Sequence, residues 1–277
     1  AQCANAGFKV DLLDIVPNGA TDRDAVAKDA IKKALKTDPA PFMHKSRAKY
    51  VTPGNLEDHM DRLADVDWII EVIIERADIK QDLYRKLAAV AKADAIITSN
   101  TSTIPLSILT DGMEPARAER FAITHFFNPP RYMPLLELVT TDATDAGVRE
   151  GLRQVCDVAL GKKVIDCKDT PGFIGNRLGT LWIQVATNAA EDHDLTIEES
   201  DALAGRHFGI PSTGIFKLMD LVGLDLGPYV SKSLYDNVNQ GDMFREEYRE
   251  SKLLEGMIAE GYTGRKGKGG WYRLNKI

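Results

Sequence analysis

Apolar and polar segments alternate through the first 168 residues in a way that predicts strands and helices in turn. The run 64–73 is almost continuously apolar, which is typical of a parallel strand covered on both faces. Further strands are expected at 8–14, 95–98, 121–124, 135–139 and 163–166. Helices are expected up to Gly7 and at 21–36, about 75–92 and 145–160. This alternation predicts an α/β domain with a doubly wound, Rossmann-like sheet.

The pattern changes at Asp169-Thr170-Pro171-Gly172. From Phe173 onward no strand is predicted before the last few residues. Helical periodicity and intervening glycines instead predict helices at 173–191, 196–204, 214–221, 226–237 and 244–260. We therefore expect two domains, an N-terminal dinucleotide-binding domain at 1–168 and an all-helical domain at 169–277.

Composition narrows the class of protein. With 277 residues, 44% hydrophobic and 27% charged, the chain has the composition of a soluble globular protein. No apolar run reaches the ~18 residues of a membrane span, and no secretory signal is visible. The three cysteines predict neither a disulfide framework nor a metal site and fit the reducing cytoplasm. The net charge of −6 argues against a nucleic-acid partner.

The first strand ends on an acid in a suggestive context. A helix closed by Gly7 leads into 8–14, which ends at Asp14. Helix, glycine, strand and terminal Asp form the second half of a dinucleotide-binding βαβ unit, in which that acid hydrogen-bonds the adenosine ribose. The first strand and the Gly-rich phosphate loop of such a unit would precede Ala1, so we expect this chain to lack an N-terminal stretch. The alternative is a turn, which favours Asp for its own reasons.

Two polar patterns each have a functional and a structural interpretation. The cluster 99–103 follows the strand 95–98, and ligands bind at the carboxyl ends of strands in open α/β sheets. Such a cluster also suits a helix N-terminus. Lysines recur at helical spacing within 21–36 and form either a solvated face or a contact to ligand phosphates.

The strongest candidate chemistry lies on the next two strands. His125 ends the strand 121–124, and Glu137 lies within 135–139. A buried carboxylate is costly unless it is paired, and a histidine is the side chain most suited to proton transfer near neutral pH. If Glu137 bonds one ring nitrogen of His125, the other nitrogen faces a substrate, which is the arrangement of a general base and its orienting partner. The alternative is a satisfied core histidine and an unrelated glutamate.

Together these pieces resemble the L-3-hydroxyacyl-CoA dehydrogenase family, the NAD-dependent enzymes of fatty-acid β-oxidation, along nearly the whole chain. Four motifs in order carry the resemblance. They are Ser99-Asn100-Thr101-Ser102, His125-Phe126-Phe127-Asn128-Pro129, Asp169-Thr170-Pro171-Gly172-Phe173-Ile174 with Asn176-Arg177, and Gly264-Arg265-Lys266 running to Gly270-Trp271-Tyr272.

The resemblance implies catalytic roles for four residues. His125 matches the base that removes the proton of the 3-hydroxyl as hydride leaves C3 for the nicotinamide. Glu137 matches the partner that orients this base and stabilises its imidazolium. Ser102 and Asn176 match polar residues that hold the substrate's hydroxyl or thioester oxygen.

The resemblance also implies binding residues and partners. An acyl-CoA is the expected substrate and NAD the expected cofactor, because an acid at Asp14 would repel the 2′-phosphate of NADP. The helical domain commonly forms a homodimer, and the chain resembles one module of longer β-oxidation enzymes. Expected cofactor contacts are Asp14, Glu75, Lys80, Asn128 and Lys266, and suggested CoA contacts are Lys32 and Lys33.

Two other functions stay open at this stage. One is a 3-hydroxybutyryl-CoA dehydrogenase that works in the reductive direction. The other is a non-catalytic relative that keeps the fold as a structural protein, which the missing phosphate loop favours. The joint presence of Ser102, His125, Glu137 and Asn176 argues against the second, because a scaffold has no use for a buried acid–base pair.

Overall fold

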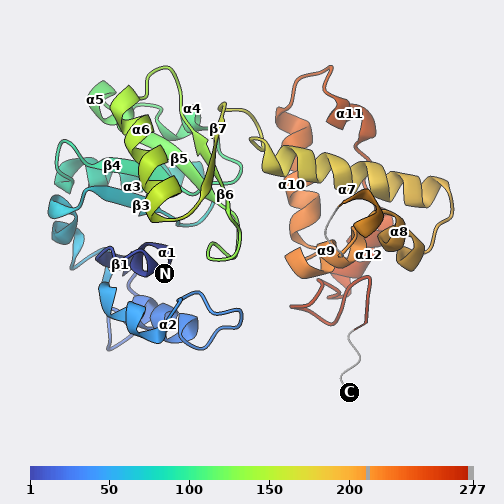
Figure 1. Ribbon diagram of the computed structural model, residues 1–277, viewed down its shortest axis with the longest axis horizontal. Helices are drawn as coiled ribbons and strands as arrows, with labels where there is room; N and C mark the ends of the chain where they lie inside the picture. The colour runs from blue at the N-terminus through green and yellow to red at the C-terminus, as the bar shows by residue number, and fades with distance from the viewer. Residues whose placement is uncertain (210–212, 274–277) are drawn as a thin grey trace. The chain divides into compact units, whose positions relative to one another are not determined.

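The computed structural model describes residues 1–209 and 213–273 and divides the chain into two compact units, Ala1–Phe173 and Ile174–Ile277. The expected boundary between 168 and 169 lies a few residues before this division. The first unit contains both strands and helices, whereas the described part of the second contains helices and one isolated bridge. The α/β class of the first unit and the helical class of the second agree with the sequence prediction (Figure 1).

A five-stranded sheet forms the centre of the first unit, and its strands follow one another in sequence order. Neighbouring strands are parallel except for one antiparallel pair, β5 with β6. In that pair His125 lies directly opposite Glu137. The strands are β3 (Trp68–Glu71), β4 (Ile96–Ser99), β5 (Phe121–Phe126), β6 (Leu135–Val139) and β7 (Lys163–Cys167).

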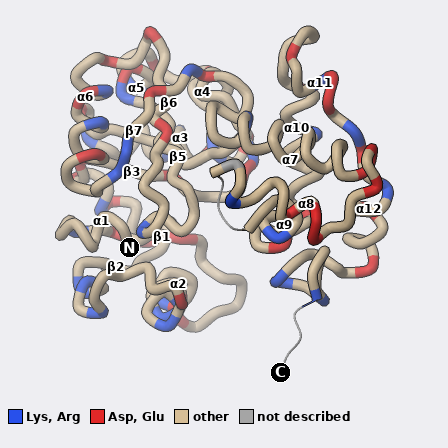
Figure 2. Tube along the Cα trace, turned by 45° about the vertical axis from the view of Figure 1, so that its right-hand side comes forward, with Lys and Arg blue, Asp and Glu red and all other residues tan. Residues whose placement is uncertain are grey.

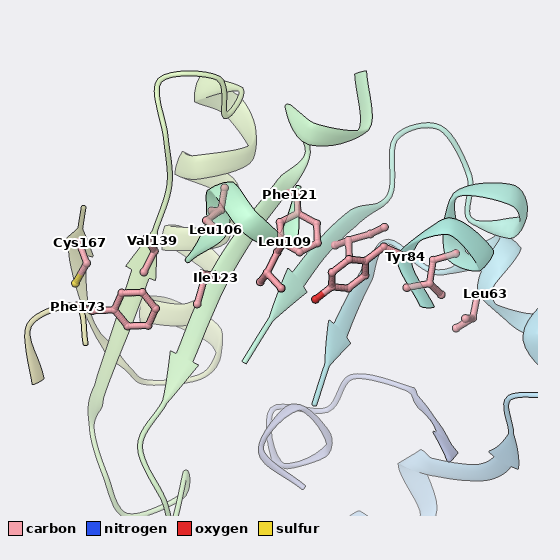
Figure 3. Close-up of a cluster of buried hydrophobic side chains, with 11 residues drawn as sticks. Leu63, Tyr84, Leu106, Leu109, Phe121, Ile123, Val139, Cys167 and Phe173 are labelled. Atoms are coloured by element: carbon pink, nitrogen blue, oxygen red, sulfur yellow. The ribbon is translucent and has the colours of Figure 1, made fainter. Parts of the chain in front are cut away.

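Alternate side chains of the sheet supply two separate cores. Phe121 and Ile123 belong to a cluster with residues of α3 (Ala77–Val90) and α4 (Leu106–Leu109), which Figure 3 shows. Ala122, between them in sequence, packs in a cluster with α6 (Ala146–Gln154) and the following π-helical turn. Because successive strand residues point to opposite faces, the apolar strands are covered by helices on both sides.

A second, two-stranded parallel sheet pairs β1 (Val10–Asp14) with β2 (Val51–Asn55). The sequence pattern did not predict β2, because Pro53 and Gly54 resemble a turn. Proline is tolerated in a strand at the edge of a sheet, and a Cβ at Gly54 would lie only 2.7 Å from the Leu13 side chain. Around this sheet lie α1 (Gln2–Asn5), α2 (Ala25–Ala34) and the 3-10 helices Lys45–Tyr50 and Met60–Asp65.

The helices of the second unit differ from the prediction at one place. The helix expected at 244–260 is two helices, α11 (Met243–Glu247) and α12 (Lys252–Ala259). Ser251 separates them, because its side chain accepts a hydrogen bond from the Leu254 amide and begins α12. The other helices of the second unit are α7 (Gly175–Asp192), α8 (Ile197–Leu203), α9 (Phe216–Val222), α10 (Leu226–Asn237) and the 3-10 helix Arg206–Phe208. One more short helix, α5 (Pro115–Ala118), belongs to the first unit.

The glycine-rich segment after α12 is bound to α9 rather than loose. The carboxylate of Asp220, which is buried, accepts hydrogen bonds from the amides of Trp271 at 2.8 Å and Tyr272 at 2.9 Å. A Cβ at Gly264 would lie 2.4 Å from the Asp220 carbonyl oxygen. Glycine is required there because the two backbones approach so closely.

The described residues contain neither a membrane-spanning helix nor a metal-binding cluster. None of their helices is long and apolar enough to cross a membrane. The same residues contain no group of three or more His, Cys, Asp or Glu side chains that could hold a metal ion.

Candidate active site

A buried histidine–glutamate pair lies at the antiparallel step of the sheet. The Nδ1 atom of His125 is 2.7 Å from Oε2 of Glu137, and the two residues are 5% and 1% exposed. Residues directly opposite in an antiparallel pair have neighbouring side chains, so the register of β5 and β6 alone brings them together. The contact expected from the sequence is present in the structure.

The surroundings of this pair are apolar. The rings of Phe127 and Phe173 lie 4.8 Å and 5.7 Å from the His125 ring, measured between centroids. Burial, together with the negative charge of Glu137, raises the pKa of the Cys167 thiol to about 12. The thiol therefore stays protonated beside the carboxylate at neutral pH, and solvent has little access to the pair.

Ser102 contacts the opposite side of the imidazole. Its hydroxyl oxygen is 3.1 Å from Nε2 of His125. With Nδ1 directed at a carboxylate, the neutral ring carries its proton on Nδ1 and leaves Nε2 as an acceptor. The serine hydroxyl then donates to Nε2, which is the nitrogen from which a proton could be exchanged with a ligand.

The loop that carries Ser102 is held by Glu75. Oε1 of this carboxylate accepts hydrogen bonds from the amides of Ser102 at 2.9 Å and Thr103 at 3.2 Å, and from the hydroxyls of Thr101 at 2.5 Å and Thr103 at 3.1 Å. Burial by itself would raise the pKa of Glu75, but these bonds and the Lys80 ammonium together lower it below its ordinary value. Glu75 is therefore a carboxylate whenever the protein is folded near neutral pH.

Lys80, an expected cofactor contact, is buried in the structure. Its ammonium is buried, 2.6 Å from Oε1 of Glu71 and 3.4 Å from Oε2 of Glu75. A buried ammonium needs such partners, so this side chain is committed to the two carboxylates. Its influence on a bound cofactor would act through Glu75.

The strand ends carry groups that fit a dinucleotide. Asp14 ends β1, and its carboxylate accepts a hydrogen bond from the Ile15 amide at 2.7 Å. Ile15 after β1, and Val72 and Ile74 after β3, are all more than 60% exposed. Half-buried carboxylates can accept ribose hydroxyls, and exposed apolar side chains can cover flat rings. Asp14 and Glu75 therefore suit NAD in chemical kind.

The remaining expected site residues lie outside this cluster. Asn128 is exposed in the loop after β5. Lys32 and Lys33 are exposed on α2, a helix where basic and acidic residues are mixed (Figure 2), and Lys32 pairs with Asp29 at 2.8 Å. Asn176 and Lys266 belong to the second unit.

Asn176 and Lys266 have different surroundings within the second unit. Asn176 lies in the first turn of α7 and is one of the residues that line a cavity of about 500 Å³ in the second unit. Lys266 forms an ion pair with Asp225 at 2.7 Å. These placements leave the proposed roles of both residues as hypotheses.

Sequence reasoning missed several residues that support the site. Glu71 is buried at the end of β3 and binds Lys80, and Ser99 is buried at the end of β4. Oδ1 of Asn100 accepts a hydrogen bond from the Phe126 amide at 2.9 Å, next to His125 in the chain. The signal for Glu71 was visible, because a lone acid within a continuously apolar strand must find a partner.

Both units match family models of known proteins, and the two models describe two domains of the same family. Residues 1–170 match the family model of the 3-hydroxyacyl-CoA dehydrogenase NAD binding domain, and residues 172–274 match that of the C-terminal domain. A protein of Deinococcus radiodurans named a probable 3-hydroxyacyl-CoA dehydrogenase is 41% identical over 276 residues, which cover 100% of this chain and 79% of that protein.

Longer relatives and solved structures match as well. A Rickettsia felis protein bearing the name of a fatty acid oxidation complex trifunctional enzyme is 40% identical over 99% of this chain, which spans only 38% of that relative. The crystal structure of FadB2 from M. tuberculosis has a TM-score of 0.82 at 27% identity and covers 99% of this chain and 93% of its own. An (S)-3-hydroxybutyryl-CoA dehydrogenase from Ralstonia eutropha has a TM-score of 0.79 at 28% identity, with the same coverage of both chains.

Proposed function

Because the chain belongs to the 3-hydroxyacyl-CoA dehydrogenase family, we propose that it oxidises L-3-hydroxyacyl-CoA to 3-oxoacyl-CoA with NAD in fatty-acid β-oxidation. The match to the family's NAD binding domain indicates the cofactor. The observation that carries the proposed reaction is the His125–Glu137 pair with Ser102 at its open nitrogen. This is a general base that is oriented on one side and accessible to a hydroxyl on the other.

His125 removes the proton of the 3-hydroxyl through Nε2. The alcohol loses its hydrogen at C3 readily only as the hydroxyl proton departs. The base must therefore reach the 3-hydroxyl group while the hydride acceptor faces C3 of the same substrate. NAD, when bound, supplies the hydride acceptor. A positioned general base typically contributes ~10²–10⁴-fold to the rate. Ser102 donates to the substrate oxygen or to Nε2 and keeps the two in line.

Glu137 stabilises the imidazolium that forms when His125 takes the proton. The charged partner is already 2.7 Å from Nδ1 before the reaction, so no rearrangement is needed as positive charge develops. In a water-poor site such fixed charges act more strongly than in water. The apolar rings of Phe127 and Phe173 support this role by limiting the access of solvent.

We assign the binding residues on the same basis. Asp14 and Glu75 would hold ribose hydroxyls of NAD, and further cofactor contacts would come from Lys80, Asn128 and Lys266. Asp14 disfavours a 2′-phosphate and hence NADP. Ser102 and Asn176 are each candidates to bind the hydroxyl or thioester oxygen of the acyl-CoA. The exposed Lys32 and Lys33 are candidates for the CoA phosphates.

Assembly and pathway are also part of the proposal. The trifunctional relative favours a role as a module of a larger β-oxidation enzyme. Exposed apolar side chains of the second unit, such as Tyr229 and Leu253, support a homodimer formed by that unit. Three free cysteines favour a reducing cytoplasm. The second candidate is a 3-hydroxybutyryl-CoA dehydrogenase that works in the reductive direction, and the name of the Ralstonia relative favours the substrate of this candidate.

The test measures NADH consumption with acetoacetyl-CoA and NAD reduction with L-3-hydroxybutyryl-CoA on the purified protein. His125→Ala should abolish both reactions, whereas the matched control His193→Ala, which changes an exposed histidine of the second unit, should not. A folded protein that binds NADH but converts neither substrate would refute the proposed substrate. A folded protein that binds no NADH would favour the structural alternative.

A further inference from the structure

A buried polar cluster lies directly beneath the Ser102 loop. We call Glu71, Lys80, Tyr84 and Ser99 the Glu71 cluster. Oε1 of Glu71 accepts hydrogen bonds from the Lys80 ammonium and the Ile73 amide, and Oε2 accepts from the hydroxyls of Tyr84 and Ser99, each at 2.6 Å. All four members are at most 3% exposed. Both oxygens of the carboxylate are thus saturated by donors.

Stability alone does not account for this cluster. Removing a carboxylate and an ammonium from water carries a desolvation cost that their attraction often fails to recover, and well-packed apolar residues of similar volume serve a core as well or better. The cluster adjoins the apolar core, where the Tyr84 and Phe121 rings meet in a T-shaped contact, 4.9 Å between centroids (Figure 3). Apolar residues in place of the whole cluster would suit such surroundings, whereas replacing Glu71 alone would leave the Lys80 ammonium buried without this partner. The cluster therefore meets a requirement other than stability.

Two paths of polar contacts lead from Glu71 to the loop that carries Ser102. In the first, Ser99 donates its hydroxyl proton to Glu71 and accepts the Thr101 amide at 3.2 Å. In the second, Lys80 bridges Glu71 and Glu75, and Glu75 accepts the amide of Ser102. The loop between β4 and α4 is therefore held by two side chains, Ser99 at the end of β4 and Glu75 in the segment after β3.

The same region also connects to the strand that carries His125. The Asn100 amide donates to the Glu71 carbonyl at 2.8 Å, and the Asn100 side chain accepts the Phe126 amide at 2.9 Å. Glu71 and its immediate partners thus fix the backbone on both sides of the contact between Ser102 and His125. A small movement of this loop would change the 3.1 Å distance from the Ser102 hydroxyl to Nε2.

We propose that Glu71 and Ser99 are positioning residues that hold loop 100–103 so that the Ser102 hydroxyl stays in register with His125. Neither side chain is exposed enough to touch a substrate or cofactor, so both act through the loop. The kinetic consequence of this assignment rests on the proposed dehydrogenase function. The structural consequence of the assignment, an ordered loop, does not depend on that function.

Two variants separate positioning from plain stability. Ser99→Ala and Tyr84→Phe each delete one buried hydroxyl that donates to the same oxygen, Oε2 of Glu71, at the same 2.6 Å. The Ser99 hydroxyl also accepts a hydrogen bond from the Thr101 amide, whereas the Tyr84 hydroxyl, on α3, interacts with the side chains of Glu71 and Ser99. We expect comparable losses of melting temperature. We expect Ser99→Ala alone to lower kcat, by about fivefold, because it acts through the Ser102 hydroxyl and misplacing that group costs no more than removing it.

The Michaelis constant for NADH should change less than about twofold in Ser99→Ala, since the Glu75 carboxylate remains in place, and kcat of Tyr84→Phe should stay within about twofold of wild type. Glu71→Gln should reproduce the kcat loss if it folds. A side-chain amide cannot accept all four donors of the carboxylate. Equal kcat values for Ser99→Ala and Tyr84→Phe would overturn the proposal, even if Glu71→Gln does not fold.

Hydrogen exchange provides a readout that does not depend on activity. Amides of 101–103 should exchange faster in Ser99→Ala than in wild type and stay protected in Tyr84→Phe. Unchanged protection in Ser99→Ala would refute the positioning role. An inactive wild-type protein would refute the proposed function, yet the exchange comparison would still decide whether Ser99 holds the loop.

Discussion

Replacing Glu137 by glutamine tests how much the buried carboxylate contributes to proton transfer. Glutamine preserves the size of the side chain and can still accept the Nδ1 proton, but it removes the negative charge opposite the imidazolium. At the 2.7 Å separation of Oε2 and Nδ1, with an effective dielectric constant of about 20, the attraction is about 6 kcal/mol. The cost of burying the carboxylate offsets part of this.

The net loss in Glu137→Gln should resemble that of a charge-assisted hydrogen bond, about 2–3 kcal/mol. That loss corresponds to a decrease in kcat of roughly 30- to 150-fold. The Michaelis constant for NADH should change little, because Glu137 is 1% exposed and separated from solvent. Steady-state kinetics with acetoacetyl-CoA measures both quantities.

The matched control is Glu150→Gln, which makes the same chemical change at an exposed position of α6 and should leave kcat unchanged. A Glu137→Gln protein that is folded and retains more than about a third of wild-type kcat would refute the reasoning. In that case the carboxylate would orient the ring without stabilising its charge.

Three further predictions follow from separate contacts. Ser102→Ala removes the hydroxyl 3.1 Å from His125 Nε2 and should lower kcat by about 2- to 10-fold, the value of one hydrogen bond, with the melting temperature nearly unchanged; a fully active variant would contradict this. Burial raises the pKa of Cys156 from the ordinary 9.0 to about 12, so between these pH values the unfolded thiol ionises while the folded thiol stays protonated. The free energy of unfolding should therefore fall by about 1.4 kcal/mol per pH unit from this group. Cys156→Ala should reduce the total slope measured by chemical denaturation by that amount, with the contribution of Cys167 remaining, whereas an unchanged slope would contradict the assignment. Gly270→Ala places a Cβ 1.8 Å from Oδ1 of Asp220 and should destabilise the second unit by about 1–3 kcal/mol, which thermal denaturation measures; an unchanged melting temperature would show that the segment can move aside.

The sequence was most informative where burial and periodicity agree. The strands around His125 and Glu137 are mostly apolar, so their existence could be inferred, and the cost of burying a charge favoured the pairing of their single ionisable residues. The two-domain organisation followed equally from the change in periodicity near Asp169. The NAD-binding and helical domains predicted in this way agree with the matched family models.

Other features depend on contacts that no local pattern encodes. The strand β2 was missed because Pro53 and Gly54 read as a turn, while its pairing with β1 is a long-range interaction. Lys80 was expected to face a cofactor, but it lies buried against Glu71, nine residues earlier in the chain. The break at Ser251 was hidden within a continuous helical pattern, because a capping side chain competes with the helix only when its hydroxyl can reach a free amide.

The most direct test follows the hydride by an isotope label and tests proton transfer with a variant of His125 in the same experiment. Acetoacetyl-CoA is incubated with the purified protein and NADH that carries deuterium at the transferred position, and the product is analysed by mass spectrometry. We predict L-3-hydroxybutyryl-CoA with deuterium at C3 from the wild-type protein, and only trace product from His125→Asn. Product without deuterium at C3, or an undiminished yield from His125→Asn, would contradict the assignment of His125 as the acid–base residue of a hydride-transfer site.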